Sequence, residues 1–341
     1  MKKQICLVPK LSGLGGMVSF QAKLIQGLRA REIPYSYDIL NPNNHVILVI
    51  GGTRRLLDLF RAKKRGTTIV QRLDGMNWMH KVEKTPMRAF LRAEVNNQLL
   101  AFIRRHLADH IIYQSDFSRD WWVREKCKTK VSFSTVHNGV ALDTYSPKGP
   151  ESPPEKHIRI LVVEGHLSGA NARGLETAIK LAKVVEKETS QTVELMVVGD
   201  VSDAVKARAH TSAPDLWITW RGVVPREAIP AIDRSAHLLF STDINAACPN
   251  SVIEALACGL PVLAYDTGAL SELVQNGAGR VVLYGSDHWQ LEDPIIPPLA
   301  KAAVDILYDN PGYKQRARER ALSAFDLNDM VESYLEILEN R

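Results

Sequence analysis

The sequence lacks a long apolar run, since none of its hydrophobic stretches approaches the roughly 18 residues that a helix needs to cross a bilayer. Cysteine is scarce too. The four cysteines, Cys6, Cys127, Cys248 and Cys258, form no Cys-x-x-Cys pair and are too sparse for a disulfide framework. The apolar stretch after Lys3 is too short for a signal peptide and predicts a first strand. We therefore expect a cytoplasmic protein.

Charge is distributed unevenly along the 341 residues, although the composition, 45% hydrophobic and 24% charged, is typical of a globular protein. Residues 1–150 hold 25 Lys and Arg against 11 Asp and Glu, whereas residues 151–341 hold 18 against 27. The basic half favours an anionic partner, such as a membrane surface, a phosphorylated acceptor or nucleic acid, or else it serves general solubility.

Length predicts about two domains, and prolines at positions 147, 150, 153 and 154 predict a linker between them. We place an N-terminal domain at residues 1–145, the linker at 146–156, a second domain at 157–324 and a tail helix at 325–341. In both domains short β-rich runs alternate with helical patterns, which predicts parallel sheets with right-handed crossovers. The predicted strands are 4–8, 46–50, 68–71, 110–114, 130–136, 158–163, 194–198, 218–222, 237–240, 261–264 and 279–282. The fold class is α/β, with two Rossmann-like, doubly wound domains facing one cleft.

Residues 248–272 carry the most informative local pattern. They predict a short helix from 251 to 258, a buried strand at 261–264 and a second helix that begins near Glu272. Glu254 and Glu272 both stand at loop–helix junctions, where open α/β sheets bind ligands. Glu254 either accepts hydrogen bonds from a ribose diol or only stabilises the helix start.

Two glycine-rich turns precede predicted helices elsewhere. The first contains Gly15 and Gly16 but no strict Gly-x-Gly-x-x-Gly motif, so it either approaches a phosphate or sugar or only joins a strand to a helix. The second follows the strand at 158–163 and is flanked by His166 and Arg173. These two cations either pair with a diphosphate or lie exposed in a loop.

Three polar residues of the first domain are catalytic candidates. Arg72 and Asp74 follow the predicted strand at 68–71, and we expect them to face the cleft near the reacting centre. His80 lies a few residues further on and is a third candidate. The alternative for Arg72 and Asp74 is a salt bridge that fixes the loop.

In this order the motifs resemble those of the GT-B glycosyltransferases known as glycosyltransferase group 1, or family 4. The likeness covers nearly the whole chain. It is carried by Trp220-Arg221-Gly222-Val223-Val224-Pro225, His237-Leu238-Leu239-Phe240 and residues 249–261 and 267–274. The resemblance implies a GT-B fold, in which a C-terminal helix crosses back to the first domain, and a retaining transfer of a sugar from a nucleotide-sugar donor.

The resemblance also implies which residues hold the donor. They are Gly15, Gly16, His166, Arg173, Val223, Asn250, Ser251, Val252 and Glu254. Glu254 would bind the ribose, the backbone near Val223 would frame the base, and Arg173 with His166 would neutralise the diphosphate. The remaining residues would contribute backbone N–H groups from the glycine turn and from the start of the helix that carries Glu254.

One residue departs from the family pattern. The family's acid pair is Glu, seven residues, Glu, and counting back from Glu254 places the first acid at Ala246. That acid normally contacts the donor sugar, so the site accepts a different sugar, Asp243 substitutes for it, or activity is weak. Cys248-Pro249-Asn250 also replaces the usual Gly-Phe-Gly.

The sequence thus predicts a metal-independent, retaining glycosyltransferase that acts on a glycan, lipid-carrier or other hydroxyl acceptor. No Asp-x-Asp motif is present to hold a metal, and no cofactor is expected. The alternatives are a non-catalytic GT-B module that binds a nucleotide sugar or glycan, and a nucleotide-sugar epimerase. The basic helical pattern at 86–108 predicts either docking on the inner face of an anionic membrane or a solvated cover for the sheet. No nucleic-acid motif accompanies it, so that partner is not expected.

Overall fold

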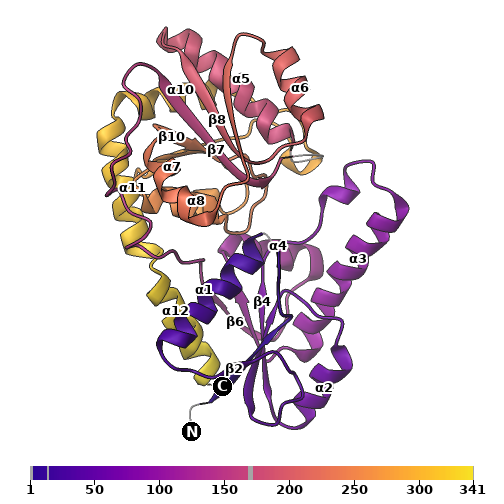
Figure 1. Cartoon of the computed structure of the whole chain (residues 1–341). Helices are drawn as coiled ribbons and strands as arrows, with labels where there is room; N and C mark the ends of the chain where they lie inside the picture. The colour runs from indigo at the N-terminus through magenta and orange to yellow at the C-terminus, as the bar shows by residue number, and fades with distance from the viewer. Residues whose placement is uncertain (1–2, 14, 168–171, 341) are drawn as a thin grey trace. The chain divides into compact units, whose positions relative to one another are not determined.

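The chain forms two compact units (Figure 1). The computed structural model describes residues 3–13, 15–167 and 172–340. Unit 1 comprises Met1–Gly139 and Leu327–Arg341, and unit 2 comprises Val140–Asp326. The tail at the end of the chain therefore belongs to the first unit, as the resemblance implies, and the proline-rich stretch belongs to unit 2.

Unit 1 is built on a parallel six-stranded sheet in the order β2-β1-β3-β4-β5-β6. The strands are β1 (Gln4–Val8), β2 (Tyr35–Ser36), β3 (Asn44–Ile50), β4 (Thr68–Leu73), β5 (His110–Tyr113) and β6 (Ser132–Thr135). The helices are α1 (Gly16–Ala30), α2 (Leu56–Lys64), η1 (Met79–Lys81), α3 (Met87–Phe102), η2 (Ile103–Leu107), α4 (Asp116–Lys126) and α12 (Leu327–Glu339). The helix expected at 86–108 is present, but it ends in the π-helical turn η2.

Helices cover both faces of this sheet, which explains why its strands are continuous runs of Val, Ile and Leu (Figure 1). Cys6, Val8, Ile47 and Val49 face α2 and η2 in one apolar core. On the other face α1 packs against α12. Gly27 permits this close approach, because a side chain there would collide with Val331.

Unit 2 is built on a second parallel sheet in the order β12-β11-β10-β7-β8-β9. The strands are β7 (Ile158–His166), β8 (Val193–Asp200), β9 (Trp217–Gly222), β10 (Leu238–Phe240), β11 (Val262–Tyr265) and β12 (Gly279–Val282). The helices are α5 (Ala172–Thr189), α6 (Asp203–Ser212), η4 (Arg226–Ala228), α7 (Ile229–Arg234), α8 (Asn250–Ala257), α9 (Leu270–Leu273), η5 (His288–Gln290), α10 (Ile296–Tyr308) and α11 (Asn310–Ala324).

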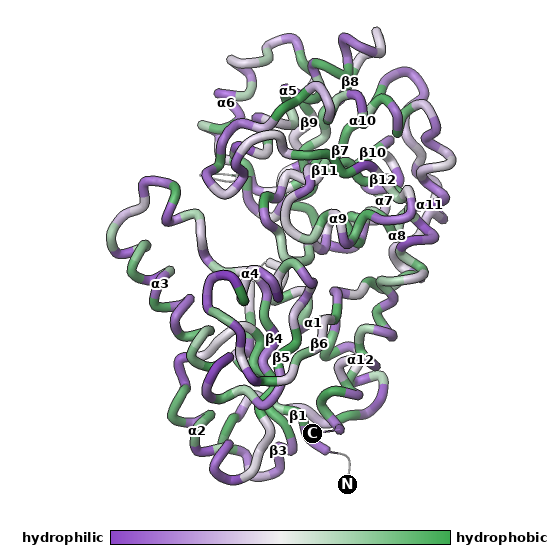
Figure 2. Tube along the Cα trace, turned by 180° about the vertical axis from the view of Figure 1, so that it is seen from behind, coloured by the Kyte–Doolittle hydropathy of each residue, from purple (hydrophilic) through white to green (hydrophobic). Residues whose placement is uncertain are grey.

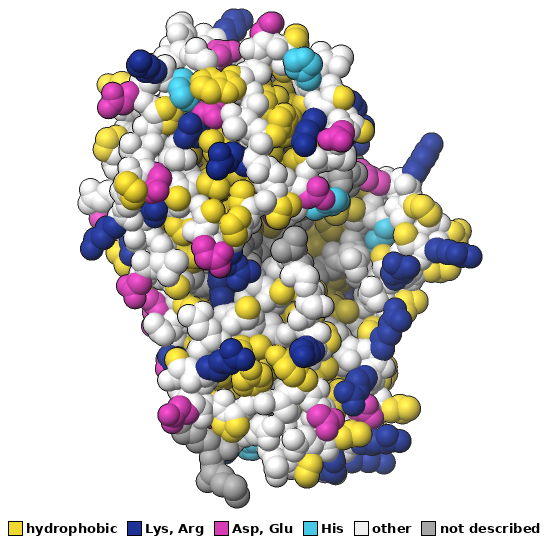
Figure 3. Space-filling model, viewed as in Figure 1, with side chains coloured by type: hydrophobic (Ala, Val, Ile, Leu, Met, Phe, Trp, Pro, Cys, Tyr) yellow, Lys and Arg dark blue, Asp and Glu magenta, His cyan; other side chains and the backbone are white. Residues whose placement is uncertain are grey.

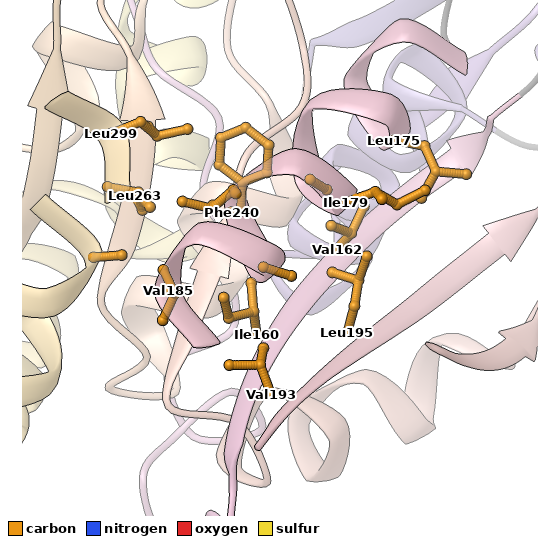
Figure 4. Packing of buried hydrophobic residues seen from close by; sticks show 14 of the residues in the cluster. Ile160, Val162, Leu175, Ile179, Val185, Val193, Leu195, Phe240, Leu263 and Leu299 are labelled. Atoms are coloured by element: carbon orange, nitrogen blue, oxygen red, sulfur yellow. The ribbon is translucent and has the colours of Figure 1, made fainter. Parts of the chain in front are cut away.

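The core of unit 2 lies between the sheet and the helices α5 and α10. Ile160 and Leu195 on the sheet meet Ile179 on α5 and Leu299 on α10, and their side chains point toward one another (Figure 4). The hydropathy along the chain agrees with this position of the core. Hydrophobic residues are concentrated in the central strands and hydrophilic residues in the outer loops (Figure 2). The opposite face is covered by α8, against which α7 and α11 pack.

The predicted α/β class with two doubly wound, parallel sheets is confirmed. No helix of the described ranges is long and apolar enough to cross a membrane.

Candidate functional site

Each sheet has a topological switch point, where successive crossovers leave in opposite directions. In unit 1 it lies between β1 and β3, and in unit 2 it lies between β7 and β10. Open α/β sheets bind ligands at the carboxyl ends of the strands beside this point. The two switch points are therefore the places to look for function.

A cavity of about 530 Å³ occupies the switch point of unit 1. Its walls come from the loops that follow β1, β3 and β4 and from helix α3. Among the predicted residues of this unit, Asp74 lines the cavity, whereas Arg72, His80, Gly15 and Gly16 do not. The volume falls in the range that small-molecule sites occupy.

Asp74 is held at the cavity by the backbone around it. Its carbonyl oxygen accepts hydrogen bonds from Ser118 Oγ at 3.0 Å and from Trp122 Nε1 at 2.7 Å, so α4 fixes the loop from behind. Burial raises the pKa of its carboxyl group above the ordinary value, and the nearby charge of Arg72 offsets only part of this effect. A raised pKa makes a carboxyl group better suited to receive a proton than an ordinary aspartate.

Arg72 lies inside unit 1, with a side chain only 1% exposed. Its Nε donates to Tyr334 Oη at 3.1 Å and its Nη2 donates to Asn138 Oδ1 at 2.8 Å. The guanidinium carbon also stands 3.7 Å from the ring centroid of Phe20. These contacts join β4 to α1, α12 and the loop after β6. The hydrogen bonds of Arg72 go to these partners rather than to Asp74. The guanidinium group thus fixes the interior of unit 1, and a catalytic role for Arg72 stays a prediction.

His80 is also engaged within unit 1. Its Nε2 lies 2.8 Å from Glu94 Oε1 on α3, and its ring packs edge-on against Phe90. The hydrogen bond from His80 lowers the pKa of Glu94. His80 therefore fixes η1 to α3, and a catalytic role for it stays a prediction.

Gly15 and Gly16 begin helix α1 at the end of the loop after β1. Gly15 adopts φ 125°, a conformation that glycine tolerates and other residues rarely do. Gln21 holds the loop in place, because it accepts a hydrogen bond from Leu11 N at 2.9 Å and donates one to Pro9 O at 2.8 Å. Residue 14, directly before Gly15, lies outside the described residues. A contact of this turn with a donor stays a prediction.

In unit 2 the predicted donor residues gather at the carboxyl end of the sheet. Glu254 lies in α8, which follows β10, and it is 8% exposed. Residues Asn250, Ser251 and Val252 form the first turn of that helix, and its N-cap residue, Pro249, makes no side-chain capping hydrogen bond. Val252 is fully buried, so only its backbone could reach a ligand.

The two predicted cations stand on the other side of the switch point. His166 ends β7, and its Nδ1 lies 3.0 Å from Asp200 Oδ2 at the end of β8. Arg173 is in the first turn of α5, and its Nη1 donates to Leu291 O at 3.1 Å. The glycine turn between them, residues 168–171, lies outside the described residues. Val223 is exposed just after β9.

Two carboxyl groups at this switch point were not recognised together from the sequence. Glu164 lies two residues before the end of β7, and Asp243 follows β10; Thr242 Oγ1 donates to Glu164 Oε1 at 3.1 Å. Burial, with the charge of Asp243, raises the pKa of Glu164 well above its ordinary value, and burial raises the pKa of Asp243 to about 6. The available signal was that each acid closely follows a buried strand.

A second buried acid lies behind Glu254. Asp233 on α7 is 1% exposed and accepts a hydrogen bond from the Cys258 thiol on α8. Burial and the charge of Glu254 raise its pKa well above the ordinary value. The hydroxyl group of Tyr145, also close to Glu254, is buried without a hydrogen-bond partner in the described structure.

Residues 158–299 match the family described as Glycosyl transferases group 1. The matched segment lies within unit 2 and is less than half of the chain. It contains β7 to β12, the switch point and α8, and it confirms the family resemblance on the segment that carried it. A search of curated protein sequences finds no match.

Solved structures of GT-B glycosyltransferases show the same fold. Sucrose-phosphate synthase from Thermosynechococcus elongatus has a TM-score of 0.74 and 15% identity over 99% of both chains. Anabaena HepE, in complex with UDP and glucose, has a TM-score of 0.70 and 15% identity over 99% of this chain and 100% of its own. WaaG, a glycosyltransferase involved in lipopolysaccharide biosynthesis, has a TM-score of 0.69 and 14% identity over 98% and 99%. The GT-B fold predicted for the chain is confirmed.

Proposed function

We propose that the protein is a glycosyltransferase that moves a sugar from a nucleotide-sugar donor to a hydroxyl acceptor. The observation that carries this proposal is the group 1 match over residues 158–299, a segment that includes Glu254 and the start of α8. The HepE structures hold UDP, UDP-glucose or UDP with glucose, which supports a nucleotide-sugar donor.

In this proposal unit 2 binds the donor. The Glu254 carboxylate accepts hydrogen bonds from the ribose, Val223 frames the base, and Arg173 and His166 neutralise the diphosphate. The N–H groups at the start of α8 add donors that suit phosphate oxygens. Their placement at the ends of neighbouring strands supports this division of roles.

We further propose a retaining, metal-independent transfer. The departing nucleoside diphosphate is then stabilised by Arg173, His166 and backbone N–H groups, which are fixed before the reaction begins. Asp74 in the unit 1 cavity is the acid–base candidate that best fits an acceptor hydroxyl, because its pKa is raised and it lines the cavity.

Ala246 favours a second candidate, a binding module without turnover. Its carbonyl accepts a hydrogen bond from Ala269 N at 2.8 Å, and its side chain carries no group that could contact a sugar hydroxyl. The half-buried Asp243, three residues earlier, is the acid that could take that role.

One experiment tests both candidates. Thermal unfolding is measured with UDP, GDP, ADP and dTDP and with the matching nucleotide sugars, and each donor that binds is then assayed for hydrolysis and transfer. We expect one base to raise the melting temperature, because a ligand that binds only the folded state stabilises it. Glu254→Gln should weaken that shift. Binding without any turnover favours the module, and no shift with any nucleotide refutes the donor site.

An anionic membrane surface is our proposal for the partner of the basic unit. Met87, Leu91 and Val95 recur every four residues on α3 and are all exposed, and Arg88 and Arg92 stand beside them. We call these five residues the α3 face. Lys and Arg side chains are interleaved with hydrophobic ones over α2 and α3 (Figure 3). Exposed apolar groups among cations suit the boundary of an anionic bilayer.

A further inference from the structure

The cavity of unit 1 contains a single basic side chain and a single acidic one in its described lining, Arg54 and Asp74. Arg54 lies in the loop between β3 and α2, and its side chain is exposed to solvent. The other polar side chains of the lining are mostly amides, those of Asn77, Asn96 and Asn97. The cavity therefore combines hydrogen-bonding groups with one fixed positive charge.

The charge of Arg54 is not neutralised by the described part of the chain, whereas its neighbours are paired. Asp58 is the acid of α2, and it accepts Arg55 Nε at 2.8 Å and Arg61 Nη1 at 3.5 Å. No ion pair of the described residues includes Arg54. Its guanidinium group is thus available to a ligand in a way that those of Arg55 and Arg61 are not.

Asp74 offsets this charge only in part. Burial favours the neutral form of its carboxyl group, so the cavity is more positive than a count of one cation and one anion indicates. A positive, concave site with low-dielectric walls attracts anions.

The amides provide the remaining specificity. Asn97 is buried, its Nδ2 donates to Asn77 O at 2.8 Å, and its Oδ1 accepts from Asn77 N at 3.0 Å. This exchange fixes the segment that carries Asn77 to helix α3, so the polar wall is held rigidly. A rigid wall of amides suits hydroxyl groups, which donate and accept.

From these observations we infer that the acceptor bound in this cavity carries an oxyanion, either a phosphate or a carboxylate, beside the hydroxyl group that receives the sugar. Arg54 binds the oxyanion through its planar fork of donors, which matches both groups. Asp74 and the amides bind the hydroxyl groups. The acceptor class of the proposed transferase is thereby specified, and this inference rests on that proposed function.

The test is a binding measurement on the full chain. Isothermal titration with glucose, glucose 6-phosphate and glucuronate compares a neutral sugar with a phosphate and a carboxylate of the same size. We expect at least one anionic sugar to bind about tenfold or more tightly than glucose at low ionic strength. A tenfold change in Kd is about the contribution of one charge-assisted hydrogen bond of modest strength. The stronger of the two anions identifies the oxyanion.

Four variants locate the effect. Arg54→Gln should reduce the preference for the anionic sugar to within about twofold, and Arg54→Lys should keep part of it, since a lysine retains the charge but loses the fork. Arg61→Gln is the matched control, because Arg61 lies outside the cavity lining and is already paired. Arg173→Ala should leave the preference unchanged, which shows that the phosphate does not bind in unit 2.

Equal binding of glucose and both anions, or a preference that survives Arg54→Gln, overturns the inference, as does the absence of binding by either anion at millimolar concentration. Failure of the donor proposal is seen separately, in the nucleotide melting shifts of the unchanged protein, which do not involve Arg54.

Discussion

Units 1 and 2 have the same sheet architecture, but their net charges have opposite signs. Both have a parallel six-stranded sheet with a switch point beside the first strand of the unit. Unit 1 holds 25 Lys and Arg against 14 Asp and Glu, and its cavity contains Arg54; unit 2 holds 18 against 24, and its switch point contains Glu164 and Asp243. The fold thus determines where a ligand binds, whereas individual side chains determine which ligand it is.

The arginines predicted to act in the two units show the same contrast. Arg72 is enclosed by Phe20, Asn138 and Tyr334, and Arg173 stands at a helix start beside a loop. One position is suited to stability and the other to ligand binding. The following predictions test the contrast, from the largest expected effect to the smallest.

Replacement of Arg72 by alanine should lower the free energy of unfolding by about 4 kcal/mol, because Tyr334 Oη and Asn138 Oδ1 lose the buried, charge-assisted hydrogen bonds that Arg72 donates. Urea denaturation measures the loss. Arg29→Ala is the control, since Arg29 also donates to a tyrosine hydroxyl, that of Tyr35, but at the surface. If Arg72→Ala is as stable as the control and yet inactive, the result contradicts a structural role and supports the catalytic role predicted from the sequence.

Replacement of Arg173 by alanine should leave stability nearly unchanged and lower kcat by about 30- to 1000-fold, which corresponds to roughly 2–4 kcal/mol of transition-state stabilisation. Steady-state kinetics with the donor found in the nucleotide panel measures the effect. Lys180→Ala on the same helix is the control, because Lys180 pairs with Asp293 at the surface. Equal kcat values for the two variants contradict the role given to Arg173.

The acid pair of unit 2 should make stability depend on pH. Because the folded-state pKa of Asp243 is raised to about 6, the folded protein binds a proton that the unfolded chain releases near pH 4. The unfolding free energy should therefore fall as pH rises from 4 to 6, by about 2 kcal/mol, and Asp243→Asn should lose this part of the slope. Urea denaturation at pH 4.5, 6.0 and 7.5 measures it.

Asp203→Asn is the control for that measurement, because Asp203 is fully exposed at the start of α6. A wild-type slope that persists in Asp243→Asn means that another group binds the proton.

Removal of one charge from the α3 face should have the smallest effect. Arg92→Gln should weaken binding to vesicles of phosphatidylcholine with one third phosphatidylglycerol by about 1 kcal/mol, or roughly fivefold. Co-sedimentation measures the bound fraction, and pure phosphatidylcholine vesicles show the background. Lys187→Gln on the exposed side of α5 in unit 2 is the control. Equal losses in the two variants show that the α3 face has no special part in membrane binding.

Much of the fold could be predicted from the sequence because its elements are local. The apolar runs at β1 and β12 gave the bounds that the structure has, and the pattern after Pro261 gave β11 within one residue. The strand β2 was missed, because it contains two residues and has no pattern of its own.

The sites were less predictable because they depend on distant contacts. The pattern around Arg72 and Asp74 marks a polar strand end, but the burial of Arg72 is caused by Tyr334, which is 262 residues away in the sequence. Likewise Glu164 and Asp243 come together only because β7 and β10 are neighbours in the sheet. The sequence could not single out Arg54 among its basic neighbours, because only the structure shows that Arg55 and Arg61 pair with Asp58.

The position of α12 has a consequence for the order of synthesis. A ribosome produces the strands of unit 1 first, then all of residues 140–326, and only afterwards the helix that supplies Tyr334 to Arg72. Unit 2 can fold while unit 1 still lacks α12. The nascent unit 1 exposes Phe20 and Leu24 on α1 until α12 has been synthesised. An N-terminal fragment that ends at Gly139 should therefore aggregate when expressed alone and become soluble when α12 is supplied on a short tether.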